Sequence, residues 1–400
     1  MIPLAARFAK ATPSPLFVIA QRVRAMTAAG VDVIPLEQGE TDYNTPAHVT
    51  RAAHDFASSE RVLYTNVDGM PALKQAIADR YALDNGLAYD LDEVSVGAGA
   101  SQVIFNAFAV TLSPGDEVIV PTPAWTVFGL AVRANRGKPV FVASSPERGF
   151  RISPSELDAA ITDRTRWLII NSPSNPSGAM YGPEDLIALS QVLRAHPHVA
   201  ILSDDLYEHQ VYDDRPFVNI VNVAPDLKDR TLVVSGVSKS YAMTGWRIGW
   251  GAGPRELVTA MRTYQAPASS SPSTIGQIAA HAALTGPQDH LVHRRSSLQA
   301  RRDAIVDGLG TVTGISCRTP QGAFYVYPQV GGLIGRTAPD GARLADDTAV
   351  AGYLLDAAHV AAVPGSAFGL SPHLRMSYAV SVERLEEACD RIRLAVEKLL

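Results

Sequence analysis

The chain contains few of the residues that build disulfide-rich or zinc-stabilised folds. Its 400 residues include two cysteines, Cys317 and Cys389, which are too few for a disulfide framework or a structural zinc site. We therefore expect a protein of the reducing cytoplasm. No apolar run approaches the roughly 20 residues that cross a membrane. The start of the chain also lacks the succession of basic, apolar and small residues that marks a secretory signal.

An excess of charge of one sign is also missing. The chain has 35 Lys and Arg against 40 Asp and Glu, a net charge of −5, and no long run of one sign. Proteins that bind nucleic acid or anionic membranes present a basic surface, so we expect neither partner. Residues 1–31 contain no Asp or Glu, as is typical of organelle transit segments. However, Val31 to Leu36 reads as a strand that follows directly, which favours a folded start.

Short apolar runs alternate with longer helical patterns along the chain. The runs comprise residues 118–120, 167–170, 199–202 and 231–234, and each is followed by polar, Gly or Pro residues. Such runs predict a mostly parallel sheet covered by helices on both faces, which is an α/β fold. The pattern of residues 381–400 predicts a closing amphipathic helix, and residues 331–341 predict an irregular loop. Ligands of parallel sheets bind beyond the carboxyl ends of the strands.

Lys239 follows one of these strands and is the first candidate for covalent chemistry. It stands in the segment S-G-V-S-K-S-Y-A-M-T-G-W-R-I-G, residues 235–249, together with Ser238 and Arg247. A lysine amine becomes a nucleophile when its pKa is lowered, and the arginine fork suits a phosphate group. A reactive lysine beside a phosphate site suggests pyridoxal phosphate, although a single lysine after a strand is most often a surface residue.

Asp204, Tyr207 and Asn175 follow two other strands. A carboxylate such as Asp204 or Asp205 would keep the cofactor's pyridine nitrogen protonated, and a tyrosine hydroxyl would bind the ring's phenolic oxygen. A solvated acidic pair explains the two aspartates equally well. Asn175 lies in N-S-P-S-N-P-S-G, residues 171–178, where it either presents an amide to a ligand or simply forms a turn.

Three further segments carry candidate binding groups. Gly99, Ala100 and Ser101 precede a helical pattern, and backbone N–H groups at such a helix start bind anions. The segment lacks the last glycine of the G-x-G-x-x-G motif, and the chain has no P-loop. Trp125 at a strand end can stack on a cofactor ring or fill the core. Arg375, in L-R-M-S-Y, needs an anionic partner, which is either a substrate carboxylate or a structural carboxylate.

Together these segments resemble the class I/II aminotransferases of pyridoxal-phosphate fold type I, and among them the bacterial aspartate aminotransferases. The resemblance extends from about Pro13 to the C-terminus, and S-K-S-Y-A-M-T-G-W-R-I-G is its most specific motif. It implies a large cofactor-binding domain over residues 47–295. It also implies a small domain that combines residues 1–46 with residues 296–400.

The resemblance also implies a role for each site residue. Lys239 would hold the cofactor as a Schiff base and move the α-proton, and Asp204 would pair with the pyridine nitrogen. The remaining cofactor-binding residues it implies are Gly99, Ala100, Ser101, Trp125, Asn175, Tyr207, Ser238, Arg247 and, from the neighbouring subunit of a homodimer, Tyr64. The substrates, an amino acid and a 2-oxo acid, would contact Gly39, Trp125, Asn175 and Arg375. No metal ligand is implied.

The chain departs from this family where the distal carboxylate of aspartate is recognised. Ser101 stands where aspartate-using relatives carry a lysine, Leu16 where they carry a threonine, and Thr12 where prephenate-using relatives carry a basic residue. Losing a charge-assisted contact costs on the order of 2–3 kcal/mol, or tens- to hundredfold in affinity. The sequence therefore predicts aminotransfer with altered determinants for a dicarboxylic substrate.

Two alternatives share parts of this pattern. A β-lyase or an oxidase built on the same fold would use the same cofactor residues. A regulator that uses the fold as a sensor would need a DNA-binding module, and no basic recognition helix is left over in these 400 residues.

Overall fold

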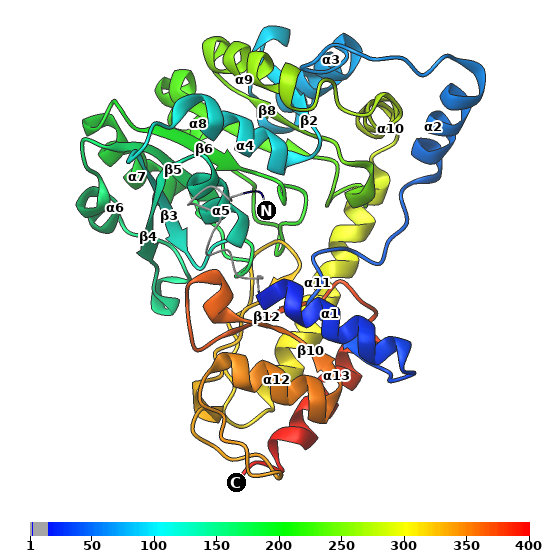
Figure 1. Ribbon diagram of the computed structural model, residues 1–400, viewed down its shortest axis with the longest axis vertical. Helices are drawn as coiled ribbons and strands as arrows, with labels where there is room; N and C mark the ends of the chain where they lie inside the picture. The colour runs from blue at the N-terminus through cyan, green and yellow to red at the C-terminus, as the bar shows by residue number, and fades with distance from the viewer. Residues whose placement is uncertain (1, 3–14) are drawn as a thin grey trace.

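A seven-stranded sheet forms the centre of the molecule (Figure 1). The computed structural model describes residue 2 and residues 15–400. The strand order is β2-β8-β7-β6-β5-β3-β4, and the strands are β2 (Val94–Gly97), β3 (Glu117–Thr122), β4 (Lys138–Ala143), β5 (Thr165–Asn171), β6 (Ala200–Asp204), β7 (Thr231–Gly236) and β8 (Gly249–Ala252). Strands β4, β3, β5, β6 and β7 pair in parallel, and β8 runs antiparallel to β2 and β7. The predicted α/β fold with a mostly parallel sheet is confirmed.

Both faces of this sheet are buried, which explains why its strands read as continuous apolar runs. In β5, Leu168 and Ile170 belong to the core on one face, whereas Trp167 and Ile169 belong to the core on the other. The first core is covered by α2 (Ala47–Ser59), α3 (Pro71–Arg80), α6 (Pro154–Ala160), α7 (Pro183–Ala195), α8 (Ile220–Val223) and α10 (Thr274–Thr285). The second is covered by α4 (Ala100–Thr111), α5 (Thr126–Ala134) and α9 (Arg255–Ala268).

A third core, separate from the two that cover the large sheet, surrounds two smaller sheets. β9 (Tyr325–Val326), β11 (Val363–Pro364) and β12 (Leu374–Ser377) form an antiparallel sheet, and β1 (Ile34–Pro35) pairs in parallel with β10 (Val360–Ala361). Three helices pack here, α11 (Asp289–Gly310), α12 (Asp347–Ala358) and α13 (Val382–Val396). The closing helix predicted from residues 381–400 is α13, and its expected apolar positions are buried in this core.

The two ends of the chain meet in this part of the molecule. Residues 31–36 were expected to form a strand, and only the two residues of β1 do so. Helix α1 (Pro15–Ala28) precedes β1 and lies near β12 (Figure 1). The domain boundary expected at residue 296 falls inside α11, which spans residues 289–310 without a break. Thr12, one of the expected substrate determinants, lies outside the described residues.

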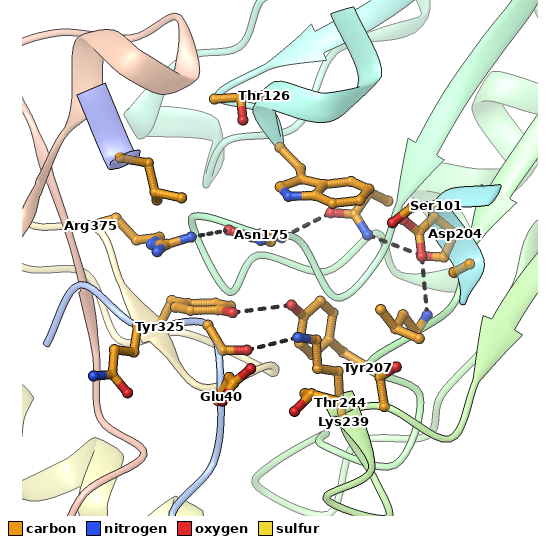
Figure 2. A pocket seen from close by; sticks show the side chains of 18 of the residues that line it. Glu40, Ser101, Thr126, Asn175, Asp204, Tyr207, Lys239, Thr244, Tyr325 and Arg375 are labelled. Atoms are coloured by element: carbon orange, nitrogen blue, oxygen red, sulfur yellow. Dashed lines mark hydrogen bonds between the residues drawn. The ribbon is translucent and has the colours of Figure 1, made fainter. Parts of the chain in front are cut away.

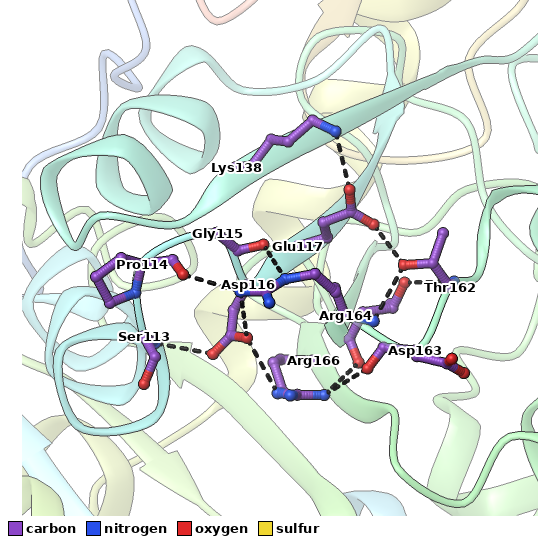
Figure 3. A network of polar contacts seen from close by, with 11 residues as sticks. Ser113, Pro114, Gly115, Asp116, Glu117, Lys138, Thr162, Asp163, Arg164 and Arg166 are labelled. Carbon is purple, nitrogen blue, oxygen red and sulfur yellow. Dashed lines mark hydrogen bonds and ion pairs between the residues drawn. The ribbon is translucent and has the colours of Figure 1, made fainter.

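Charged residues form contacts between the N-terminal ends of β3, β4 and β5, at the edge of the sheet opposite to the predicted ligand site. Lys138 forms an ion pair with Glu117 at 2.9 Å, and the Thr162 hydroxyl donates to the same carboxylate at 2.7 Å. Arg166 lies 3.4 Å from Asp116 (Figure 3). These contacts link the starts of β3, β4 and β5, where the β3–β5 register shifts between Glu117 and Val118. Among residue 2 and residues 15–400, no helix is long and apolar enough to cross a membrane.

Candidate functional site

The polar segments that follow the parallel strands converge on one cavity of about 740 Å³. Because the strands run the same way, the residues after β3, β5, β6 and β7 meet at one edge of the sheet. The expected site residues that line the cavity are Leu16, Gly39, Ala100, Ser101, Trp125, Asn175, Asp204, Tyr207, Ser238, Lys239, Arg247 and Arg375. Segments far apart in the sequence are thus brought together as the sequence predicted.

Lys239 lies three residues beyond the end of β7 and is partly buried. Its Nζ donates a hydrogen bond to the Gly39 carbonyl at 2.7 Å. Burial lowers the pKa of Lys239 to about 8, although the nearby Glu40 carboxylate opposes this change. The unprotonated fraction of the amine near neutral pH is therefore larger than that of an ordinary lysine, as a nucleophile requires.

Asp204 is the last residue of β6 and has little compensation for its charge. Its side chain is buried, with 4% exposed, and Oδ1 accepts a hydrogen bond from the Leu206 N–H at 3.3 Å. Burial raises the pKa of Asp204 to about 7, against the opposing effects of the Leu206 N–H and of Lys239. A cation placed against this carboxylate would stabilise its ionised form.

The start of α4 forms a cradle for an anion. Gly99 caps the helix with a φ of +86°, a conformation that suits glycine. A Cβ on Gly99 would collide with the Arg247 guanidinium, and one on Gly249 would collide with the Ala100 backbone. Arg247 donates to the carbonyls of Thr244 at 2.9 Å and Ala98 at 3.1 Å. The helix N-terminus and a fixed arginine thus point toward the same space.

Arg375 lies on the side of the cavity opposite Ser101, and Tyr207 lies beside Lys239 (Figure 2). Arg375, on β12, donates to Asn175 Oδ1 at 3.2 Å, and its guanidinium lies over the Tyr325 ring at 4.8 Å. The hydroxyls of Tyr207 and Tyr325 are 3.2 Å apart. Burial raises the pKa of Tyr207 well above its ordinary value, so its phenol is protonated and able to donate a hydrogen bond.

Two aromatic residues of the predicted site differ in their placement. Trp125 precedes α5, lines the cavity and packs edge-on against Phe128 at 5.3 Å between ring centroids. Tyr64 is 90% exposed and does not line the cavity within the described part of this chain. Its role at the phosphate of a neighbouring subunit therefore stays a prediction.

Sequence reasoning missed several residues of the cavity wall. They are Ala20, Glu37, Gln38, Glu40, Thr126, Asn171, Leu206, Thr244, Gly245, Tyr325 and Phe368. Glu37 and Glu40 flank Gly39, so their position beside a predicted contact was a usable signal. Tyr325 and Phe368 lie in apolar segments whose pattern indicates only a core position.

The residues present fit pyridoxal 5′-phosphate, the cofactor expected from the sequence. Asp204 is a buried carboxylate that forms no ion pair within residue 2 and residues 15–400, and a protonated pyridine nitrogen would supply one. The tight approach of Gly99, Gly249 and Arg247 leaves backbone N–H groups and a guanidinium for a phosphate. Lys239 supplies an amine for the aldehyde. The fold and this cavity are typical of an enzyme that binds a phosphorylated aldehyde on a lysine.

Comparison with known proteins agrees with this class of enzyme. The family model "Aminotransferase class I and II" matches residues 31–392. An aspartate aminotransferase of Rhizobium meliloti is 51% identical over 395 residues, which are 99% of this chain and 96% of the relative. An aspartate/prephenate aminotransferase of Cereibacter sphaeroides is 49% identical over 385 residues, 96% of each chain.

Solved structures give the same result. A crystal structure of the Rhizobium meliloti aspartate aminotransferase superposes with a TM-score of 0.97 at 50% identity and covers 100% of both chains. The Thermus thermophilus aspartate aminotransferase with maleate gives a TM-score of 0.91 at 36% identity, covering 99% of this chain and 100% of the other. The chain belongs to the class I and II aminotransferase family, whose members use pyridoxal phosphate, and it is an aminotransferase.

Proposed function

We propose that this aminotransferase uses pyridoxal 5′-phosphate held by Lys239 to move an amino group between an L-amino acid and a 2-oxo acid. The observation that carries the proposal is the meeting of Lys239, Asp204, Arg247 and Arg375 in one cavity. These side chains offer a nucleophile of lowered pKa, a partner for a pyridinium, a phosphate contact and a carboxylate contact.

The cofactor, when bound, supplies an electron sink for the substrate's α-carbon. The chain's own residues hold and orient the reactants. Arg375 binds the α-carboxylate of the substrate, and Asn175 fixes the guanidinium through its hydrogen bond at 3.2 Å. Lys239 acts as the base that takes the α-proton, which its lowered pKa favours. Tyr207 donates a hydrogen bond to the ring's phenolic oxygen.

The relatives' names suggest aspartate as one substrate, and the cavity suggests a departure from it. Ser101 and Leu16 both line the cavity, so the positions expected to recognise a distal carboxylate carry no cation here. We propose an enzyme similar to aspartate aminotransferases in its cofactor site but altered in these determinants.

The assembly is also part of the proposal. Tyr64 is fully outside the cavity of its own chain, which is consistent with a homodimer in which it reaches the partner's phosphate site. We propose a large domain over residues 47–295 and a small domain from residues 1–46 and 296–400, in a cytoplasmic enzyme.

Two measurements test this function. Protein loaded with pyridoxal phosphate should show a visible absorption band that bleaches on adding an amino donor and returns on adding a 2-oxo acid. Multiple-turnover transamination by Lys239→Ala would refute the assignment. Ammonia released without a 2-oxo acid acceptor would indicate a β-lyase or an oxidase instead.

A further inference from the structure

Glu37 is a buried carboxyl group in the cavity wall whose second oxygen has no protein partner. The residue follows β1 and is 5% exposed. Its Oε2 makes no hydrogen bond within residue 2 and residues 15–400. Its backbone carbonyl accepts a hydrogen bond from Arg375 Nη2 at 2.5 Å. Glu37 therefore lies beside the arginine that is expected to receive the substrate's α-carboxylate.

The charged groups of the cavity wall indicate which substrate side chains the site would accept. The described wall contains three cations, Lys239, Arg247 and Arg375. Under the proposed function, the cofactor's aldehyde takes Lys239, its phosphate takes Arg247, and the α-carboxylate of the substrate takes Arg375. No cation of the described wall is left for a second carboxylate.

The acidic groups of the wall are not balanced in the same way. Asp204 would be paired by the pyridinium of the cofactor. Glu37 and Glu40 are not paired by the cofactor: the charge of Arg375 acts on Glu37, and the charge of Glu40 raises the pKa of Lys239. Burial raises the pKa of Glu37, and Arg375 opposes this by favouring the ionised form.

The neighbouring wall is apolar. Leu16 and Ala20 come from α1 and line the cavity together with Phe368. Leu16 packs into a cluster that includes Phe150, Tyr327 and Phe368. An anionic side chain placed here would lose water without gaining a cation from the described wall of this chain, and it would lie near a carboxylate of like charge.

We propose that Glu37 is a specificity-determining residue that disfavours amino donors with an anionic side chain and favours donors whose side chain is uncharged. This inference rests on the proposed function and names the substrate class of the same site. It places the distinction between donors in a residue that follows β1, in addition to Ser101 and Leu16.

Donor pairs that differ only in charge test the inference. Loaded protein is mixed with asparagine or aspartate, and with glutamine or glutamate, and the bleaching of the visible band is followed without an acceptor. We expect the apparent second-order rate constant for asparagine to exceed that for aspartate by at least about tenfold, since losing one charge-assisted contact is worth about that factor. Glutamine should exceed glutamate in the same sense.

Two variants assign the effect. Glu37→Gln should shift the aspartate-to-asparagine ratio toward aspartate by at least about tenfold, with the band and the cofactor affinity unchanged. Glu40→Gln is the matched control, because it removes the other nearby carboxylate of the described cavity wall, which is exposed to solvent, and it should change this ratio less. Loss of packing alone would slow both donors equally and leave the ratio unmoved.

The outcomes separate the two proposals. If no donor bleaches the band, the proposed function fails. If the unmodified protein bleaches with aspartate as fast as with asparagine, the inference about donor class is overturned, and this result does not depend on any variant folding. An unchanged ratio in loaded Glu37→Gln, or an equal shift in Glu40→Gln, overturns the role given to Glu37.

Discussion

Replacing Asp204 by asparagine should stabilise the cofactor-free protein while removing its activity. Asparagine has the shape of a protonated aspartate, and its amide oxygen can still accept the hydrogen bond from the Leu206 N–H. The substitution therefore removes the buried negative charge and leaves the packing at the end of β6 in place. It also removes the group that would pair with the cofactor's pyridine nitrogen.

The size of the gain follows from the pKa of Asp204. This pKa is 3.8 for an ordinary aspartate and about 7 in the fold, and one pKa unit corresponds to about 1.4 kcal/mol. The folded state binds the proton more tightly than the unfolded chain does, so the free energy of unfolding falls as pH rises from about 4 to about 7. Burial of the Asp204 carboxyl group costs about 4 kcal/mol at pH 8, where the group is ionised in the fold, and about 2 kcal/mol at pH 5, where the fold keeps it protonated.

Urea unfolding of both proteins without cofactor measures this difference. Each protein is unfolded at pH 5 and pH 8 at one fixed protein concentration, because an oligomer's stability depends on concentration. Asp204→Asn should be the more stable protein at both pH values, and its advantage should grow by about 2 to 3 kcal/mol from pH 5 to pH 8. Asp229→Asn, at an exposed position, is the control and should show no such growth.

One result would refute the reasoning. If the gain in the free energy of unfolding from Asp204→Asn is the same at pH 5 and pH 8, burial does not raise the pKa of Asp204. The structural basis for a pyridinium partner would then be lost. With cofactor added, we expect Asp204→Asn to lose at least about a hundredfold in turnover, since one preorganised electrostatic partner is worth about that factor.

Three further predictions concern other residues of the cavity. Because burial lowers the pKa of Lys239 to about 8, the rate at which cofactor-free protein regains its visible band should rise with pH and level off above about 8; a rise that continues to pH 10 would contradict this. Ser101→Lys should raise the rate constant of band bleaching by aspartate by about tens- to hundredfold, and an unchanged value would show that this position does not contact the distal carboxylate. Arg375→Gln should raise the KM for the amino donor by about a hundredfold while leaving the band intact, and a normal KM would remove Arg375 from the carboxylate site.

The apolar runs and the polar segments after them predicted the sheet and part of the cavity wall. Runs that are apolar at every position indicate strands buried on both faces, and β5 shows this alternation between two cores. Parallel strands then bring Asp204 and Lys239 to one edge. The strand expected over Val31 to Leu36 was too long. Only Ile34 and Pro35 pair with another strand, whereas the apolar side chains beside them are buried by packing against other residues.

Sequence patterns identified fewer of the residues on the substrate side of the cavity. Tyr325 and Phe368 read as core residues, and they are indeed buried, but their rings also flank Arg375 at 4.8 and 5.0 Å. Apolar periodicity reports burial and does not distinguish a core from the wall of a cavity.

The sequence by itself predicted the sheet and the meeting of Lys239 and Asp204 at its edge, because local patterns specify strands and the parallel arrangement places their ends together. The tertiary structure decided which groups stand beside them. Glu37 and Arg375 are 338 residues apart and meet through a single hydrogen bond between a side chain and a carbonyl. No local pattern encodes that contact, since it arises only when both ends of the chain pack against one core. The charge balance that we expect to select the substrate therefore belongs to the fold.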